Sequence, residues 1–168
     1  MSNQGNKSYS ALFLDRDGVI NHKIEGYVVS FSDFHFIEGV RESIPILNQI
    51  FNRIIIVTNQ QGIGKKLMSV NELEVLHKRM LVDIEISFGK IDEIYYCPHL
   101  ASDDCSCRKP KSGMLIAAKK DFPDIDFSRS ILLGDSETDI ISAQKVGMDS
   151  VKLSKKYTLR DWTNDIFS

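Results

Sequence analysis

Short apolar runs alternate with segments of helical periodicity along this chain, a pattern that favours a parallel α/β sheet. Five of the runs predict strands: Ala11–Asp15, Arg53–Thr58, Ile91–Tyr96, Ser130–Gly134 and a weaker Ser150–Leu153. The segments between them predict helices over Gly39–Ile50, Val70–Phe88, Gly113–Lys120 and Thr138–Val146. We therefore expect a Rossmann-like sheet of about five parallel strands with helices on both faces.

Local signals indicate where two of these helices begin and end. Residues Ser69–Glu72 have the sequence of a capping box, which predicts the start of the longest helix, and Gly89 predicts its end. Pro45 lies inside the helical pattern of Gly39–Ile50. Because proline lacks a backbone N–H group, Pro45 predicts either a kink in this helix or a later start.

Two further segments have no assigned place in the sheet. Residues Asn21–Glu38 are too many for a minimal turn and include two aromatic clusters, which predicts a small hairpin or a flap over the end of the first strand. The C-terminal segment, Lys155–Ser168, contains Trp162 and Phe167. We expect these two aromatic side chains to pack a short helix back onto the body of the protein.

Length and composition narrow the class of protein. A chain of 168 residues predicts a single domain spanning residues 1–168, with residues 1–8 as a disordered tail. A net charge of −2 without a long basic run argues against binding to nucleic acid or to anionic membranes. No apolar run approaches the roughly 18 residues of a membrane helix, and the polar N-terminus lacks a signal-peptide core. We expect a cytoplasmic monomer.

Two carboxylates, Asp15 and Asp17, follow the first predicted strand and Gly18 comes directly after them. Alternate side chains of a strand point the same way, so the two carboxylates should project together, and glycine lets the chain turn away at once. Such a pair can bind Mg²⁺ and can divide nucleophile and acid–base roles. The DxDG pattern also occurs in calcium loops and ordinary turns. From this segment alone, a polar strand end followed by a turn is therefore as good an interpretation as a catalytic pair.

Three more segments carry groups suited to phosphate chemistry. They are Thr58–Gly64 after the second strand, the pair Arg108–Lys109, and Gly134–Asp139 after the fourth strand. Each also has an ordinary interpretation: a polar turn, a solvated basic pair, and acidic residues favouring a helix N-terminus. In a parallel sheet, however, these strand ends meet at one edge. That edge would combine carboxylates for a divalent cation, neutral donors and a lysine, which suits phosphoryl transfer.

In this order, the segments resemble the motifs of the haloacid dehalogenase (HAD) superfamily of phosphohydrolases, whose first motif is DxDG after a strand. Within it, the chain is similar to the heptose-1,7-bisphosphate phosphatase and histidinol phosphatase group. The resembling segments are residues 15–21, 58–64, 97–99, 105–114 and 134–139. The resemblance implies a HAD-like fold, and the chain has no insertion long enough for a large cap domain.

The resemblance also implies roles for individual residues. Asp15 would be the nucleophile that forms an aspartyl-phosphate, and Asp17 would protonate the leaving oxygen and then deprotonate the attacking water. For the first of these steps Asp17 must be protonated near neutral pH, so we expect surroundings that disfavour its anion. Thr58 would donate a hydrogen bond to the transferring phosphate, and Lys109 would neutralise charge on Asp15 and phosphate.

Metal and substrate contacts follow from the same resemblance. Mg²⁺ would be held by the Asp15 carboxylate, the Asp17 backbone carbonyl and Asp135. The implied substrate contacts are Asn59, Arg108 and Asn21. Asp139 lies in the same motif as Asp135, and we expect it to support the site or cap a helix rather than bind the metal.

All three cysteines lie within eleven residues, and a histidine lies among them. Cys97, His99, Cys105 and Cys107 offer three thiolates and an imidazole, a complete set for tetrahedral Zn²⁺. Because the set leaves no open position, it predicts a structural zinc and not a catalytic one. The spacing is not that of the common CxxC knuckle, so the prediction also depends on the related group, in which this loop binds zinc.

The favoured substrate is a small phosphorylated sugar, D-glycero-D-manno-heptose 1,7-bisphosphate, with removal of the 7-phosphate. Histidinol phosphate is the alternative within the same chemistry, because the same motifs serve both activities. A zinc-stabilised binding module without catalysis is the alternative of another class. Degenerate relatives usually lack a carboxylate or the lysine, whereas Asp15, Asp17, Lys109 and Asp135 are all present here.

Overall fold

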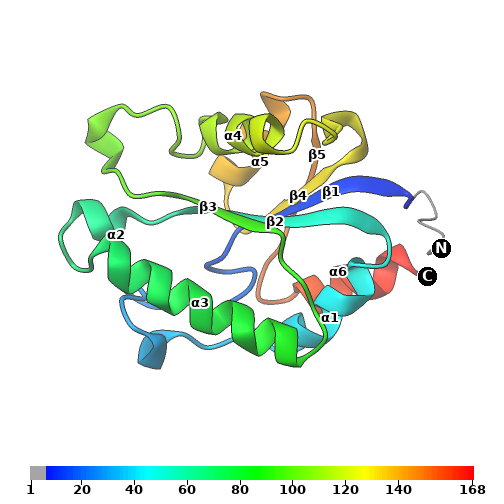
Figure 1. Ribbon diagram of the computed structural model, residues 1–168, viewed down its shortest axis with the longest axis horizontal. Helices are drawn as coiled ribbons and strands as arrows, with labels where there is room; N and C mark the ends of the chain where they lie inside the picture. The colour runs from blue at the N-terminus through cyan, green and yellow to red at the C-terminus, as the bar shows by residue number, and fades with distance from the viewer. Residues whose placement is uncertain (1–6) are drawn as a thin grey trace.

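The computed structural model describes residues 7–168, whose strands form one parallel sheet with helices on both faces (Figure 1). The strands are β1 (Tyr9–Leu14), β2 (Phe51–Asn59), β3 (Glu93–Cys97), β4 (Ile131–Gly134) and β5 (Asp149–Lys152), in the order β3-β2-β1-β4-β5. The helices are α1 (Val40–Leu47), α2 (Gln61–Gly64), α3 (Val70–Ile86), α4 (Gly113–Asp121), α5 (Glu137–Gln144) and α6 (Leu159–Ile166). The predicted α/β architecture is confirmed.

The central strands are buried on both faces of the sheet. In β1, Leu12 and Leu14 pack into the core shared with α1, α3 and α6, whereas Ala11 and Phe13 pack into the core shared with α4 and α5. Figure 1 shows these two groups of helices on opposite sides of the sheet. Because neither face meets water, the strand sequence is a continuous apolar run without the alternation of a half-exposed strand.

The first strand begins earlier than the sequence predicts. β1 starts at Tyr9, which pairs with Phe51 of β2. Most of the predicted disordered tail, residues 1–8, lies outside the described residues. Within its last two residues, Lys7 donates hydrogen bonds to the carbonyl oxygens of Asn48 at 2.6 Å and Phe51 at 3.1 Å, so Lys7 is attached to the body of the protein.

The segment from residue 21 to 38 forms a loop and not the hairpin named as one expectation. Its regular structure is a 3-10 turn at Phe31–Asp33, and a single antiparallel bridge joins Asn21 to Phe36. Tyr27 and Val28 of this loop line the same cavity as Asp15, as expected of a flap. No cap domain is inserted between β1 and α1.

The start of α3 follows the sequence closely, whereas its end does not. The Ser69 hydroxyl accepts from the backbone N–H of Glu72, and the Glu72 carboxylate accepts from the N–H of Ser69, which confirms the capping box. Beyond the helix end, Phe88 takes the left-handed conformation at φ 65°. A side chain at Gly89 would instead meet Ile44 at 2.8 Å, so Gly89 permits close packing against α1.

The two remaining helix predictions have mixed outcomes. α1 begins at Val40 and contains Pro45, so this proline does not delay the start of the helix. α6 packs Trp162 into the core as expected, but the prediction for Phe167 is wrong because its side chain is 55% exposed beyond the helix end. Among residues 7–168, no helix has both the length and the apolar character needed to cross a membrane.

Candidate active site

The ends of β1, β2 and β4 bring the predicted polar segments together at one cavity of about 310 Å³. Its lining includes Asp15, Asp17, Asn59, Arg108 and Lys109. The convergence of these segments is what a parallel sheet imposes, because the carboxyl ends of neighbouring strands share an edge. A cavity of this volume is large enough to hold a small metabolite.

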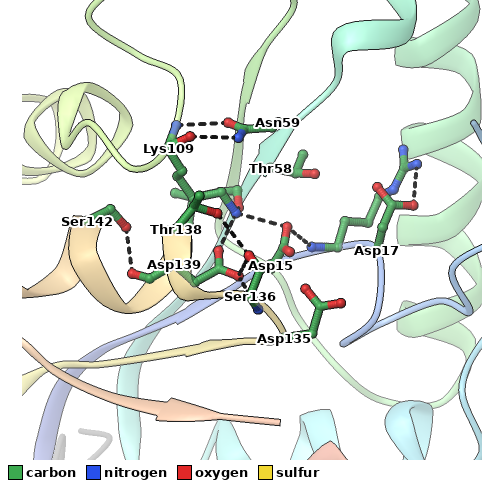
Figure 2. A network of polar contacts seen from close by, with 12 residues as sticks. Asp15, Asp17, Thr58, Asn59, Lys109, Asp135, Ser136, Thr138, Asp139 and Ser142 are labelled. Carbon is green, nitrogen blue, oxygen red and sulfur yellow. Dashed lines mark hydrogen bonds and ion pairs between the residues drawn. The ribbon is translucent and has the colours of Figure 1, made fainter. Parts of the chain in front are cut away.

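The Lys109 ammonium group lies at the centre of the site (Figure 2). Its Nζ atom is 3.0 Å from Asp15 Oδ1, 2.6 Å from Asp139 Oδ1 and 2.9 Å from the carbonyl oxygen of Val57. These three acceptors match the three protons of an ammonium group. Burial disfavours the cation, but Asp15 and Asp139 outweigh this effect and raise the pKa of Lys109. Lys109 therefore stays charged beside Asp15.

Asn59 determines where the Lys109 backbone lies. Asn59 Nδ2 donates to the Lys109 carbonyl at 3.1 Å, and the Lys109 N–H donates to Asn59 Oδ1 at 3.0 Å (Figure 2). Both ends of the carboxamide are thus engaged by protein. Asn59 thereby attaches the loop carrying Lys109 to the end of β2. It also lines the cavity, and its contact with substrate stays a prediction.

The carboxyl group of Asp15 lies in crowded, desolvated surroundings. Its Oδ1 accepts from the Arg16 N–H at 2.8 Å and pairs with Lys109. Burial raises the pKa of Asp15 to about 7, opposed by the attraction of Lys109 and assisted by the neighbouring carboxylates of Asp139 and Asp17. An added cation would relieve this crowding, because positive charge favours the ionised form.

Asp17 has surroundings opposite to those predicted. Burial disfavours its anion, but the Arg16 guanidinium and hydrogen bonds from Asn21 and Gln60 prevail and lower the pKa of Asp17. Its Oδ1 accepts from Arg16 and Asn21, and its Oδ2 accepts from Gln60, all at 2.9 Å. The expectation that the neighbourhood disfavours the Asp17 anion is therefore wrong, because three donors surround the carboxylate.

Two residues predicted to touch ligand are buried. Asn21 has no exposed surface and donates to Asp17, so it orients that carboxylate and does not reach the cavity as the predicted substrate contact would. Thr58 is likewise fully buried, and its hydroxyl accepts from Gln60 Nε2 at 2.9 Å. Among residues 7–168 no acceptor pairs with the Thr58 hydroxyl hydrogen, so this hydroxyl can also donate.

Gly18 brings the first loop against Asp135. It adopts φ 87°, and a Cβ atom there would overlap with Asp135 Oδ2. Any larger residue would thus be strained and would collide with this carboxylate. Lys23 pairs with the same Oδ2 atom at 2.6 Å, while Asp135 Oδ1 is buried without a hydrogen-bond partner among residues 7–168.

The donor set fits a divalent cation. Carboxylate oxygens of Asp15, Asp135 and Asp139 lie within 4.8 Å of one another, and oxygen ligands are those that Mg²⁺ prefers. The unpartnered Asp135 Oδ1 is an acceptor that a cation would satisfy. Asp139 is already engaged by Lys109 and by Ser136 at the start of α5, so Asp15 and Asp135 are the carboxylates open to metal.

Arg108 contributes positive charge to the cavity wall. It follows the cysteine loop, lines the cavity with Lys109, and its Nη1 atom is buried without a partner among the described residues. A buried guanidinium nitrogen in this position can donate to an anionic ligand. The geometry is consistent with the predicted contact between Arg108 and substrate.

The four predicted zinc ligands gather in one cluster beside the cavity. The Cys97 sulfur lies 3.1 Å from that of Cys107 and 3.6 Å from that of Cys105, and His99 Nδ1 lies 3.2 Å from the Cys107 sulfur. None of the cysteines forms a disulfide. All four ligand atoms lie within 4.8 Å of one another, which is compatible with a tetrahedral zinc site.

Three functional contacts were not found from the sequence. Arg16 and Gln60 hold Asp17, and Asp139 is the second carboxylate on Lys109. Each of these residues lies inside a recognised motif, but no local pattern indicates its partner. Only for Asp139 was there a local signal: its position three residues after Ser136 is that of a capping box, which the structure confirms.

Comparison with known proteins agrees with this geometry. The model of the HAD-hydrolase-like family matches residues 106–164. The D-glycero-beta-D-manno-heptose-1,7-bisphosphate 7-phosphatase of Vibrio cholerae is 40% identical over 145 residues, covering 82% of this chain and 77% of the relative. The D-glycero-alpha-D-manno-heptose-1,7-bisphosphate 7-phosphatase of Campylobacter jejuni is 42% identical over 130 residues, covering 77% and 73%.

This chain belongs to the HAD-like family of heptose bisphosphate phosphatases. The family is one of phosphoric monoester hydrolases, which accounts for a site built from carboxylates, amides and a buried lysine. Its curated members include enzymes named for each anomer of the sugar, so membership by itself does not select the α or β form.

A solved structure supports this family assignment along nearly the whole chain. The D,D-heptose 1,7-bisphosphate phosphatase from B. bronchiseptica, complexed with magnesium and phosphate, superposes with a TM-score of 0.86 at 25% identity. The match covers 94% of this chain and 98% of the other. Members of the heptose bisphosphate phosphatase family thus share this sheet, and one of them holds magnesium and phosphate.

Proposed function

We propose that this protein is a Mg²⁺-dependent phosphatase that removes the 7-phosphate of D-glycero-D-manno-heptose 1,7-bisphosphate. The observation that carries the proposal is the buried Lys109 ammonium, 3.0 Å from Asp15 on a cavity that Asp17 also lines. Similarity to heptose bisphosphate 7-phosphatases over about four fifths of the chain supports this choice of substrate. A cytoplasmic monomer remains the sequence-based prediction.

Asp15 is the proposed nucleophile. Its carboxylate oxygen forms a bond to phosphorus while the bond from phosphorus to the sugar oxygen breaks, which leaves an aspartyl-phosphate. Lys109 stays within ion-pair distance of Asp15 and counters negative charge on the carboxylate and the transferring phosphate. Because the Lys109 ammonium is already held by protein groups, it needs little reorganisation during the reaction.

Asp17 is the proposed general acid and then general base. It gives a proton to the departing sugar oxygen, and afterwards takes one from the water that attacks the aspartyl-phosphate. The lowered pKa of Asp17 suits the second step. For the first step, the negative charge of the bound phosphate must raise this pKa, as a neighbouring like charge does.

The neutral and cationic groups around the cavity bind the substrate in this proposal. The Thr58 hydroxyl, which has a free proton, donates to the transferring phosphate. Arg108, with a buried and unpartnered Nη1 atom, binds a second anionic group of the substrate. Asn59 contributes by holding Lys109 in place. A bisphosphorylated sugar supplies the second anionic group that Arg108 requires.

The proposal includes two metal ions with separate duties. Asp15, Asp135 and the backbone carbonyl of Asp17 would hold Mg²⁺, which supplies positive charge to the phosphate when bound. Cys97, His99, Cys105 and Cys107 would hold Zn²⁺, which orders the loop leading into Arg108 and Lys109. The zinc set is complete with protein ligands and therefore has a structural duty.

The proposed function is tested by phosphate release in the presence of Mg²⁺. Both anomers of heptose 1,7-bisphosphate and histidinol phosphate are compared by kcat/KM, with Asp15→Asn as the control that lacks the nucleophile. We expect a preference of at least tenfold for one bisphosphate anomer and loss of turnover in the variant. A preference for histidinol phosphate would overturn the substrate, and activity retained by Asp15→Asn would overturn the mechanism.

A further inference from the structure

A buried line of side chains connects helix α3 to Asp17. Arg16 Nη2 donates to Asp17 Oδ1 at 2.9 Å, and Arg16 Nη1 lies 3.0 Å from Nε2 of His77. Arg16 has no exposed surface, and His77 is 5% exposed. Two contacts therefore link a helix in the lower layer of Figure 1 to a carboxylate at the cavity.

The direction of the hydrogen bond between Arg16 and His77 follows from chemistry. A guanidinium group can only donate, so Nε2 of His77 must accept, and the imidazole must be neutral with its proton on Nδ1. Burial and the nearby Arg16 cation lower the pKa of His77 to about 3, so the neutral form is the one present near neutral pH. His77 is thus a permanent acceptor for Arg16.

Arg16 has few other contacts that would hold its guanidinium group in place. Its Nε atom is buried without a partner among the described residues, and the ring of Phe34 lies 5.9 Å from its central carbon. Without His77, the Nη1 group would also be a buried donor lacking an acceptor, which is costly in a desolvated site. The guanidinium would then turn or admit water, and Asp17 would lose a fixed partner.

The imidazole itself is held by packing. His77 lies on α3 among the buried residues Leu73, Leu76 and Met80 of the same helix. Its ring meets that of Tyr96 edge-on, with 6.3 Å between the centroids. A rigid helix therefore supplies the acceptor, which is how a supporting group holds a reactive side chain within a narrow range of orientations.

We propose that His77 is a positioning residue for the general acid–base Asp17 and acts through Arg16. The proposal rests on the proposed phosphatase function. His77 does not line the substrate cavity, so its effect should fall on proton transfer and not on substrate binding. The sugar oxygen is a poor leaving group that needs a proton from Asp17, whereas an aryl oxygen departs without one.

The experiment compares His77→Leu, His77→Gln and wild type on heptose 1,7-bisphosphate and on p-nitrophenyl phosphate. Leucine removes the acceptor, while the glutamine carbonyl can accept from Arg16 in place of Nε2. Met80→Leu is the matched control, since it changes a buried residue of the same helix that takes no part in the contacts among His77, Arg16 and Asp17. Circular dichroism and unfolding midpoints establish that each variant is folded.

We expect His77→Leu to lower kcat on the sugar phosphate about tenfold with KM unchanged. This loss is a fraction of the rate acceleration that general acid–base catalysis usually provides. The loss on the aryl ester should be smaller, and His77→Gln should restore most of the activity. An unchanged kcat, or an equal loss on both esters, overturns the role of His77. If wild type hydrolyses neither ester, the proposed function fails instead and this proposal fails with it.

Discussion

Asn59 and Lys109 are joined by a pair of hydrogen bonds between one side chain and one backbone, although 50 positions separate them in the sequence. The same arrangement recurs where the Asn48 carboxamide binds the Lys90 backbone, at 2.9 and 2.8 Å, away from the cavity. The Asn59 pair of hydrogen bonds thus holds a residue of the active site, whereas the Asn48 pair stabilises only the fold. Comparing variants of Asn59 and Asn48 therefore tests what the Asn59 hydrogen bonds contribute to activity.

Asn59→Ala should lower kcat/KM about tenfold and destabilise the protein by about 2 kcal/mol, because it removes two hydrogen bonds and frees the loop carrying Lys109. Asn48→Ala should cost a similar free energy of unfolding while leaving kcat/KM unchanged. Phosphate-release kinetics and urea unfolding of both variants measure these effects. Equal losses of activity in the two variants would refute a special duty for Asn59.

Asp139→Asn should be strongly destabilising, by about 3–5 kcal/mol, because it breaks a fully buried ion pair with Lys109. Asp124→Asn is the comparison: its partner Arg53 lies 2.9 Å away, but the Asp124 side chain is 60% exposed. An exposed pair contributes about 1 kcal/mol or less. Urea unfolding of the two variants should differ clearly, and similar midpoints would contradict this assignment.

Between pH 7.5 and pH 5, His77 should contribute a loss of stability to the wild-type protein. Its pKa is about 3 in the folded protein and 6.5 ordinarily, so below pH 6.5 the unfolded chain binds a proton that the folded chain does not. This proton linkage costs about 2 kcal/mol at pH 5.

His77→Gln removes that group and should lose less stability on acidification than wild type. Asp15 also titrates in this range, and its raised pKa stabilises the folded state on acidification, but it contributes to both proteins alike. Urea unfolding at the two pH values gives the comparison. Parallel losses in the two proteins would show that His77 does not remain neutral in the folded state.

Zinc removal should loosen the loop that carries Lys109. We expect one zinc ion per wild-type chain, and Cys105→Ser should lose the metal, the activity and several degrees of melting temperature. Ser106→Ala changes the neighbouring residue without removing a ligand and serves as the control. Elemental analysis and thermal unfolding, each with and without a chelator, make the measurement; zinc fully retained by Cys105→Ser would contradict the ligand set.

Lys23→Met should strengthen Mg²⁺ binding in the absence of substrate. Lys23 lies 2.6 Å from Asp135 Oδ2 and offsets the negative charge of a proposed metal ligand. Since the Lys23 side chain is 54% exposed, the effect should be about 1 kcal/mol, or about fivefold in Kd. Titration calorimetry with Mg²⁺ tests this, with Lys90→Met as the control; an unchanged or weaker affinity would count against it.

Local features of the sequence determined the order of the elements and the chemistry of the site. Buried strands need continuous apolar runs, and a capping box forms within four residues, so both can be recognised without knowing the rest of the fold. The DxDG segment and the cysteine loop likewise keep their chemical groups close together in the chain. Because the strands are parallel, their direction alone then places the polar segments that follow them at one edge of the sheet.

Only the tertiary structure decided which side chains meet across elements. Arg16 and His77 are 61 positions apart, and their contact depends on how α3 packs against one face of the sheet. The lowered pKa of Asp17 has the same origin. Donors from the segments that follow β1 and β2 outweigh the effect of burial, which would raise the pKa. Such pairings depend on the sum of all packing interactions, and no local pattern in the sequence encodes that sum.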